Sequence, residues 1–130
     1  MIEKTHSNPW LPWPSTRPQA KLRLFCFPYA GGGASMFRNW TRDLPPEIDV
    51  RPVQLPGRER RLMEDPYHHL TPLVAAVEHA LLPYLLEPFA FFGHCLGALV
   101  AFELSRRLRD EHKQLPTALF VSAHRAPQLP

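Results

Sequence analysis

Cys95 is the residue best placed to do chemistry, because it is the centre of Gly-His-Cys-Leu-Gly at residues 93–97. The spacing is that of G-x-S-x-G, in which a sharp strand-to-helix turn exposes a nucleophile, here with cysteine in place of serine. A helix N-terminus favours the thiolate, which is the reactive form of cysteine. The backbone N–H of Leu96 would face the position where an oxyanion forms. We therefore predict a nucleophile at Cys95, with Gly93 and Gly97 allowing the strand and the helix to approach closely.

The alternative for Cys95 is an inert buried cysteine, which is the common fate of a free thiol. The flanking sequence favours the nucleophile. Residues 89–92 form an apolar and aromatic run typical of a strand buried on both faces, and residues 96–108 read as a helix, with no proline and no glycine after Gly97. His94 is adjacent to Cys95, and neighbouring side chains on a turn point apart. We therefore expect His94 to pack or to support the loop rather than to act as a base.

A second candidate segment is Pro-Tyr-Ala-Gly-Gly-Gly-Ala at residues 28–34, which directly follows a predicted strand. Its three glycines predict a tight bend with exposed amide groups. A phosphate-binding loop is one interpretation, but the sequence lacks both the Lys-Ser/Thr pair of a P-loop and the G-x-G-x-x-G order. Some hydrolases place such a loop opposite the nucleophile, where it supplies a second oxyanion donor. We prefer this interpretation because it uses both halves of the chain.

Strands and helices that alternate along the chain are expected to position these two segments. The alternation predicts an α/β fold, with a parallel sheet of about four strands and helices on both faces. The strand that ends at Phe27 should lie beside the strand that ends at His94, which would bring the glycine loop next to Cys95. The strands are expected near residues 22–28, 49–55, 89–94 and 117–122.

Local signals predict where these elements begin and end. Ser35 and Thr71 are plausible N-caps of the first two helices. Pro52, inside the second strand, predicts a bulge or incomplete pairing. Pro83 should kink or end the second helix near its last turn. The charged residues 58–61 are predicted to form a solvated segment after a turn.

The composition limits the classes of function. The chain has 130 residues, one domain at most, in which residues 1–20 are a proline-rich extended arm and residues 21–130 the folded part. A net charge of +3 without a broad basic face argues against nucleic-acid binding. The apolar runs are too short to span a bilayer, and the N-terminus has no signal-peptide pattern. We expect no membrane partner and no metal site. Cys26 and Cys95 are expected to be reduced, as in a cytoplasmic protein.

The sequence resembles the α/β-hydrolase fold, and within it the stand-alone (type II) thioesterases of nonribosomal peptide and polyketide synthesis. The resemblance extends from about residue 21 to the end of the chain and rests on four segments taken together. They are Leu-Phe-Cys-Phe-Pro-Tyr-Ala-Gly-Gly-Gly at residues 24–33, Gln-Leu-Pro-Gly-Arg-Glu at 54–59, Phe-Ala-Phe-Phe-Gly-His-Cys-Leu-Gly-Ala at 89–98 and Leu-Phe-Val-Ser-Ala-His-Arg-Ala-Pro at 119–127.

The resemblance implies an enzyme that hydrolyses aberrant or stalled acyl groups from the phosphopantetheine arm of an acyl or peptidyl carrier protein, with no cofactor of its own. It implies Cys95 as the nucleophile and an oxyanion hole made by the backbone amides of Leu96 and of Tyr29 or Ala30. The family usually has serine at the position of Cys95. Cysteine is still a competent acyl acceptor, and its attack on a thioester would be a thiol exchange of nearly balanced energy.

The triad partners of such a nucleophile are missing from their expected places. In this fold the acid and the histidine follow the nucleophile along the chain, and here only residues 96–130 follow Cys95. Some related thioesterases carry the acid just after the next strand, where this sequence reads Ser-Ala-His at residues 122–124. Residues 110–112, Asp-Glu-His, are predicted at the far end of the helix, on the wrong side of the sheet. We therefore expect the N-terminal half of a thioesterase, truncated before the acid and the base.

Three other functions were weighed against this resemblance. A dienelactone-hydrolase-like enzyme also uses G-x-C-x-G, but the glycine loop and the turn at residues 56–59 match thioesterases better. Malonyl-type acyltransferases share the turn at Cys95 but typically carry glutamate at the position of Ala98. A non-catalytic remnant that binds carrier proteins would show affinity without hydrolysis, so thioester turnover separates it from an enzyme.

Overall fold

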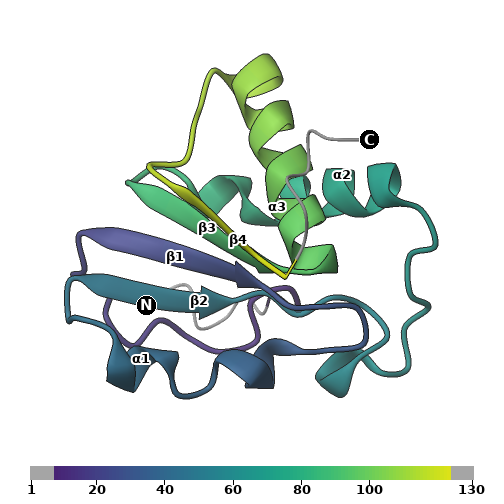
Figure 1. Cartoon of the computed structure of the whole chain (residues 1–130), viewed down its shortest axis with the longest axis horizontal. Helices are drawn as coiled ribbons and strands as arrows, with labels where there is room; N and C mark the ends of the chain where they lie inside the picture. The colour runs from purple at the N-terminus through teal and green to yellow at the C-terminus, as the bar shows by residue number, and fades with distance from the viewer. Residues whose placement is uncertain (1–7, 124–130) are drawn as a thin grey trace.

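A four-stranded parallel sheet forms the centre of the computed structural model, which describes residues 8–123 (Figure 1). The strand order is β2-β1-β3-β4, and every neighbouring pair is parallel. Phe27 of β1 is in register with Gly93 of β3, so the predicted neighbours are confirmed. The predicted α/β fold is therefore confirmed as well. The strands are β1 (Leu22–Phe27), β2 (Ile48–Pro52), β3 (Phe89–His94) and β4 (Leu119–Ser122).

Helices cover both faces of this sheet. Figure 1 shows α2 (Leu70–Leu81) and α3 (Leu96–Arg107) on one face, and the short α1 (Trp40–Asp43) on the other. Short 3-10 turns at Ala34–Phe37, Glu59–Arg61 and Leu82–Tyr84 and a π turn at Leu108–His112 complete the described elements. Across the described residues, no helix combines the length and the apolar character that a bilayer crossing demands.

The alternation of side chains on β1 divides the core into two layers. Phe25 and Phe27 point into the larger layer under α2 and α3, whereas Leu24 and Cys26 pack with Phe37 in the smaller layer on the α1 side. All of these side chains are buried. Because β1 and β3 are apolar on both faces, they occupy the middle of the sheet. The C-terminal ends of these two strands therefore lie beside each other.

One edge of the sheet carries exposed apolar side chains. On β4, Phe120 is 53% exposed and Val121 is 40% exposed. The backbone oxygens of Ala118 and Ser122 accept hydrogen bonds from β3 and from Cys95, at 3.1 Å and 2.9 Å. Alternate residues of a parallel strand direct their polar groups to the same side. Leu119 and Val121 therefore direct theirs to the outer edge of β4, with which no strand pairs within residues 8–123.

Several expected boundaries differ from the structure. Ser35 is not an N-cap, because the chain enters a 3-10 turn at Gly33 and the Ser35 hydroxyl donates to Glu59 instead. Thr71 is not an N-cap either, because α2 begins at Leu70. The next residue, a proline, is tolerated there because the first-turn N–H groups of a helix have no intrahelical partner.

The ends of β2 and α2, which lie at or near prolines, agree better with the sequence predictions. Strand β2 ends at Pro52 rather than continuing to Leu55, since proline cannot donate to the ladder, and Val53 N–H then donates to the Cys26 carbonyl at 2.9 Å. Helix α2 ends at Leu81, and Pro83 lies in the 3-10 turn that follows, as predicted.

The segment at residues 58–61 is not fully solvated, contrary to expectation. Arg61 is only 7% exposed. Its guanidinium lies 4.2 Å from the centre of the Trp10 ring, donates to the Gln54 carbonyl at 3.1 Å and forms two hydrogen bonds with Glu64. The N-terminal arm thus folds back onto this turn, and the stacking removes one basic side chain from water.

Candidate active site

Cys95 lies at the turn between β3 and α3 in a backbone conformation that is rare for residues with a side chain. Its φ is 55° and its ψ is −115°. Its N–H donates to the Ser122 carbonyl at 2.9 Å, and its carbonyl accepts from Ala98 N–H at 2.9 Å. Such strain persists only where surrounding contacts over-determine it, and it is common at functional sites. Cys95 is half-buried and lies at the N-terminus of a twelve-residue helix.

Gly93 and Gly97 permit a very close approach of backbone to backbone. A Cβ on Gly93 would overlap the carbonyl of Gly97, and a Cβ on Gly97 would overlap the carbonyl of Phe27 and lie 2.7 Å from that of Pro28. The N-terminus of α3 is therefore pressed against the end of β1. That contact places the start of the glycine loop beside the Cys95 turn.

The first residues of the glycine loop form a tight turn. Gly32 N–H donates to the Tyr29 carbonyl at 2.9 Å, and Gly31 between them has a φ of 82°. Tyr29 and Ala30 are exposed, and the Tyr29 ring meets the ring of His94 edge to face at 6.0 Å between centroids. The loop and the Cys95 turn therefore lie side by side. The assignment of Tyr29, Ala30 and Leu96 to an oxyanion hole stays a prediction.

The side-chain hydrogen bonds of His94 and Cys95 lead to the end of β4. The Cys95 thiol donates to the carbonyl of Ala123 at 3.3 Å. His94 Nδ1 lies 3.2 Å from Ser122 Oγ. His94 thus links β3 to β4 through its ring, and its hydrogen bond does not go to the thiol.

No described side chain that could serve as a general base forms a hydrogen bond with the Cys95 thiol. Within residues 8–123, the hydrogen bond of its side chain leads to a backbone carbonyl and not to an imidazole or carboxylate. Asp110, Glu111 and His112 lie in the π turn at the C-terminal end of α3, as predicted. His124, which follows β4 in sequence, lies outside the described residues.

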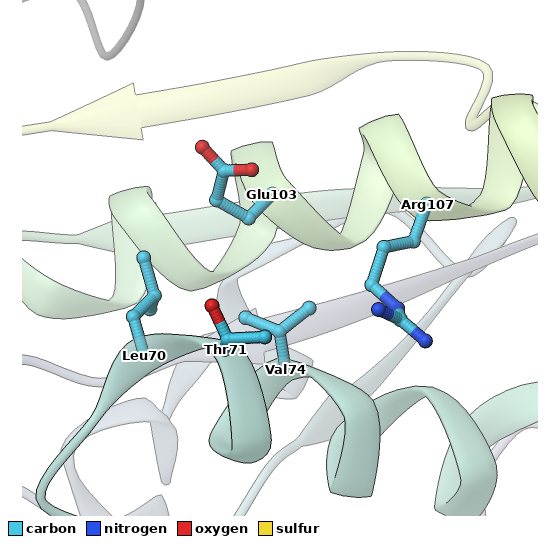
Figure 2. Close-up of a pocket in the computed structure, with 5 residues that line it drawn as sticks. All are labelled: Leu70, Thr71, Val74, Glu103 and Arg107. Carbon is cyan, nitrogen blue, oxygen red and sulfur yellow. The ribbon is translucent and has the colours of Figure 1, made fainter.

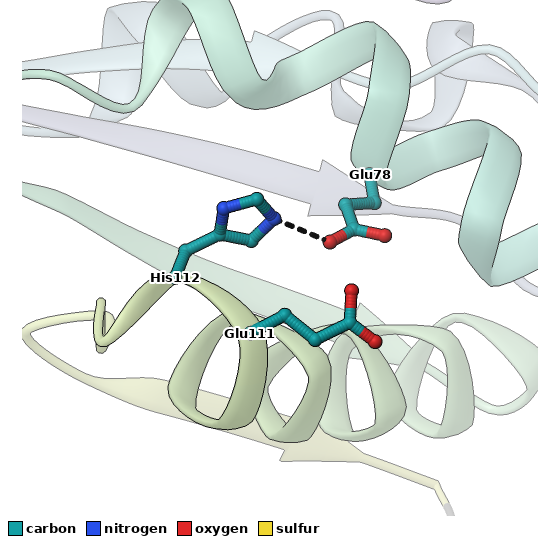
Figure 3. Close-up of side chains that lie close together, drawn as sticks. All are labelled: Glu78, Glu111 and His112. Carbon is teal, nitrogen blue, oxygen red and sulfur yellow. Dashed lines mark hydrogen bonds and ion pairs between the residues drawn. The ribbon is translucent and has the colours of Figure 1, made fainter.

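An ion-pair cluster that was not predicted from the sequence joins α2 to the end of α3 (Figure 3). Glu78 is buried, with its Oε1 accepting from Arg107 Nε at 2.8 Å and its Oε2 2.8 Å from His112 Nε2. Glu111 contributes a third ligand-type side chain within 4.8 Å of these atoms. Arg107 already balances the charge of Glu78, so the cluster is an ion-pair network. Glu78 is too far in sequence from Arg107, Glu111 and His112 for spacing to reveal the cluster.

A shallow groove also lies between these two helices, away from the Cys95 turn. Its volume is about 280 Å³, and Figure 2 shows its walls on α2 and α3. Arg107 belongs both to this groove and to the ion-pair network. The lining residues are Leu70, Thr71, Val74, Glu103 and Arg107.

Cys95 should react with iodoacetamide much faster than Cys26 in the folded protein. Cys26 is fully buried in β1, and burial raises the pKa of its thiol far above the ordinary value, so almost no thiolate is present at neutral pH. Mass spectrometry of the tryptic peptides should show alkylation of Cys95 alone at early times. Denaturant should make the two cysteines react alike. Equal labelling in the folded state would contradict the turn geometry.

Comparison with known proteins gives one consistent result. Residues 22–129 match the family model for the thioesterase domain. The linear gramicidin dehydrogenase LgrE of Brevibacillus parabrevis is 48% identical over 131 aligned positions, which cover 99% of this chain and 50% of that protein. The gramicidin S biosynthesis protein GrsT of Aneurinibacillus migulanus is also 48% identical, over 95% of this chain and 48% of its own length.

Solved structures agree with the sequence matches. RedJ, a thioesterase of the prodiginine pathway in Streptomyces coelicolor, superposes with a TM-score of 0.80 and 43% identity over 99% of this chain and 51% of RedJ. The type II thioesterase BorB of the borrelidin cluster gives a TM-score of 0.79 and 36% identity over 91% of this chain and 48% of BorB. The chain thus spans about half the length of the relatives it matches.

Proposed function

Because this chain belongs to the thioesterase domain family, we propose that it cleaves acyl thioesters with Cys95 as the nucleophile. The observation that carries the proposal is the Cys95 turn, a strained residue at a helix N-terminus with the glycine loop beside it. A dienelactone-hydrolase-like enzyme would share the cysteine turn, but the family match over residues 22–129 favours the thioesterase.

The substrates proposed are acyl groups on the phosphopantetheine arm of carrier proteins in peptide or polyketide synthesis. RedJ is a thioesterase of the prodiginine biosynthetic pathway, BorB is a type II thioesterase of the borrelidin biosynthetic cluster, and GrsT is a gramicidin S biosynthesis protein. The partner is then an acyl or peptidyl carrier protein, and the pantetheine group arrives with the substrate rather than as a resident cofactor. Both cysteines are free, which fits a reducing compartment such as the cytoplasm.

In the first step, the Cys95 thiolate attacks the carbonyl carbon of the thioester. A new carbon–sulfur bond forms, and the carbonyl electron pair moves onto oxygen. The amides of Leu96 and of Tyr29 or Ala30 stabilise that oxyanion. Its collapse breaks the carbon–sulfur bond to the carrier, whose sulfur leaves as a thiolate and takes up the proton that Cys95 lost. The acyl group is then held on Cys95.

The second step requires water to attack the acyl group on Cys95. Water must lose a proton as it attacks, and that step is normally assisted by a histidine. General-base assistance is worth roughly 10² to 10⁴ in rate. The described contacts of Cys95 include no such base. The same observation favours a second candidate function, a carrier-binding protein without turnover.

The 130-residue polypeptide should accept one acyl group on Cys95 and release it very slowly. Incubation with an acyl-pantetheine thioester, followed by intact-mass and peptide mass spectrometry, measures both steps. Cys95→Ala should abolish the adduct, whereas Cys26→Ala, at a buried thiol, should leave it in place. Carrier-protein affinity without any adduct would support the non-catalytic candidate. Sustained hydrolysis that survives Cys95→Ala would overturn the nucleophile assignment.

A further inference from the structure

The side chain of Gln54 connects the far end of the glycine loop to the turn that follows β2. It is buried, with 1% of its surface exposed. Its Oε1 accepts the Ala34 N–H at 2.9 Å, and its Nε2 donates to the carbonyls of Leu55 at 3.3 Å and Arg58 at 3.1 Å. A buried amide with every contact made to backbone holds two segments in one fixed arrangement.

Glu59 makes a second connection between the same two segments. One carboxylate oxygen accepts the Ser35 N–H at 3.3 Å, and the other accepts the Ser35 hydroxyl. The carboxylate fills the space over Gly33, where a Cβ would overlap it. Glu59 itself has a φ of 47°, which is uncommon for a residue with a side chain. Its strained backbone directs an acidic side chain toward the loop, although the residue is exposed.

The turn that carries Gln54 and Glu59 is held in place by contacts with Trp10 of the N-terminal arm and with Arg61. Gln54 N–H donates to the Trp10 carbonyl at 2.9 Å, and Arg61 stacks on the Trp10 ring and donates to the Gln54 carbonyl. Gly57 N–H donates to the Arg61 carbonyl at 2.8 Å. The N-terminal arm, the turn and the glycine loop therefore form a continuous series of contacts.

We propose that Gln54 and Glu59 are positioning residues that hold the glycine loop in the shape that presents its amides to the Cys95 site. The loop is clamped at both ends. Its start lies against Gly97 at the carbonyls of Phe27 and Pro28, and its end is bound at Ala34 and Ser35. Glycines between two fixed points would otherwise sample many conformations. This inference rests on the proposed function, because it assigns the loop an oxyanion to stabilise.

The test compares two reactions of the same thiol in the whole chain. Acylation of Cys95 by acyl-pantetheine forms an oxyanion, whereas alkylation by iodoacetamide displaces iodide at a saturated carbon and forms none. Glu59→Ala should lower the acylation rate about tenfold or more, less than the roughly 10²- to 10³-fold effect of removing an oxyanion donor outright. The alkylation rate should not fall. Removal of a negative charge would favour a nearby thiolate, so the charge change alone acts in the opposite direction.

Three variants keep the test specific. Ser35→Ala should reproduce part of the Glu59→Ala effect, and the double variant should be no slower than Glu59→Ala, because both remove the same contact. Glu59→Gln keeps one acceptor oxygen and should recover part of the acylation rate. Glu103→Gln, a change to a half-buried glutamate paired with Arg106 on α3, should leave both rates unchanged.

Hydrogen exchange of the amides of residues 31–35 gives a readout that does not depend on acylation. Exchange there should be faster in Glu59→Ala than in the parent chain, with protection of α3 unchanged. Parallel losses of acylation and alkylation, or unchanged exchange in the loop, would overturn the inference. If the parent chain takes up no acyl group, the proposed function fails, and the exchange measurement alone then supports or overturns the clamp.

Discussion

Replacement of Gly97 by alanine should lower the free energy of unfolding by about 4 kcal/mol, among the largest effects expected of a single substitution. The new Cβ would overlap the Phe27 carbonyl and lie 2.7 Å from the Pro28 carbonyl. Both neighbours are backbone, so neither can rotate away as a side chain would. Urea denaturation should show a much lower midpoint with an unchanged slope. The loss is a large share of the about 5–15 kcal/mol that stabilises a typical domain.

Gly31→Ala is the matched control for that result. Gly31 has a φ of 82°, but a Cβ there would have no heavy atom within 4 Å. The cost is therefore the conformational term alone, about 1–2 kcal/mol. If the two variants were equally stable, backbone contact at Gly97 would not be the feature that holds the end of β1 against α3.

Arg107→Met should destabilise the protein by about 3 kcal/mol, because it removes a partner from a buried carboxylate. The side chain of Glu78 is only 7% exposed and depends on Arg107 for its closest cationic contact, at 2.8 Å. The estimate is at the lower end for buried pairs because the Arg107 side chain is 32% exposed. Thermal or urea unfolding monitored by circular dichroism measures the change.

Arg106→Met controls for the loss of a cationic side chain on the same helix. Arg106 pairs with Glu103 at the surface and is 52% exposed, so its cost should be about 0.5 kcal/mol or less. Addition of Glu78→Gln to Arg107→Met should recover part of the lost stability, since no buried charge is then left without its partner. A double variant as unstable as the sum of its parts would show that the two side chains act independently.

The parts of the fold that sequence could predict are those that depend on nearby residues. The apolar runs before and after Cys95 and the glycines at 93 and 97 specify a strand, a turn and a helix. The structure has them as β3 (Phe89–His94) and α3 (Leu96–Arg107). The pairing of β1 with β3 was expected because it brings the glycine loop next to Cys95, and the register of Phe27 with Gly93 confirms it. Helix ends were less predictable. The Ser35 hydroxyl, for example, donates to the distant Glu59 instead of capping the helix that follows it.

The contacts that sequence could not predict join residues far apart along the chain. Gln54 reaches Ala34, Arg61 reaches Trp10, and Glu78 reaches Arg107. None of these pairs has a characteristic spacing, and each polar side chain alone is typical of an exposed position. Gln54 and Glu59 stood in a segment that sequence could identify only as part of a family resemblance. The structure shows what both side chains do, because each forms hydrogen bonds with the end of the glycine loop.

Within residues 8–123 no strand pairs with the outer edge of β4, and this has a consequence for the solubility of the polypeptide. Natural edge strands are commonly protected by lysine, proline or a bulge. Here Leu-Phe-Val-Ser carries neither lysine nor proline, and Phe120 and Val121 face water. Such a strand offers both backbone pairing and apolar contact to any extended chain that reaches it. If this edge stays uncovered in solution, we expect it to promote self-association of the polypeptide as its concentration rises.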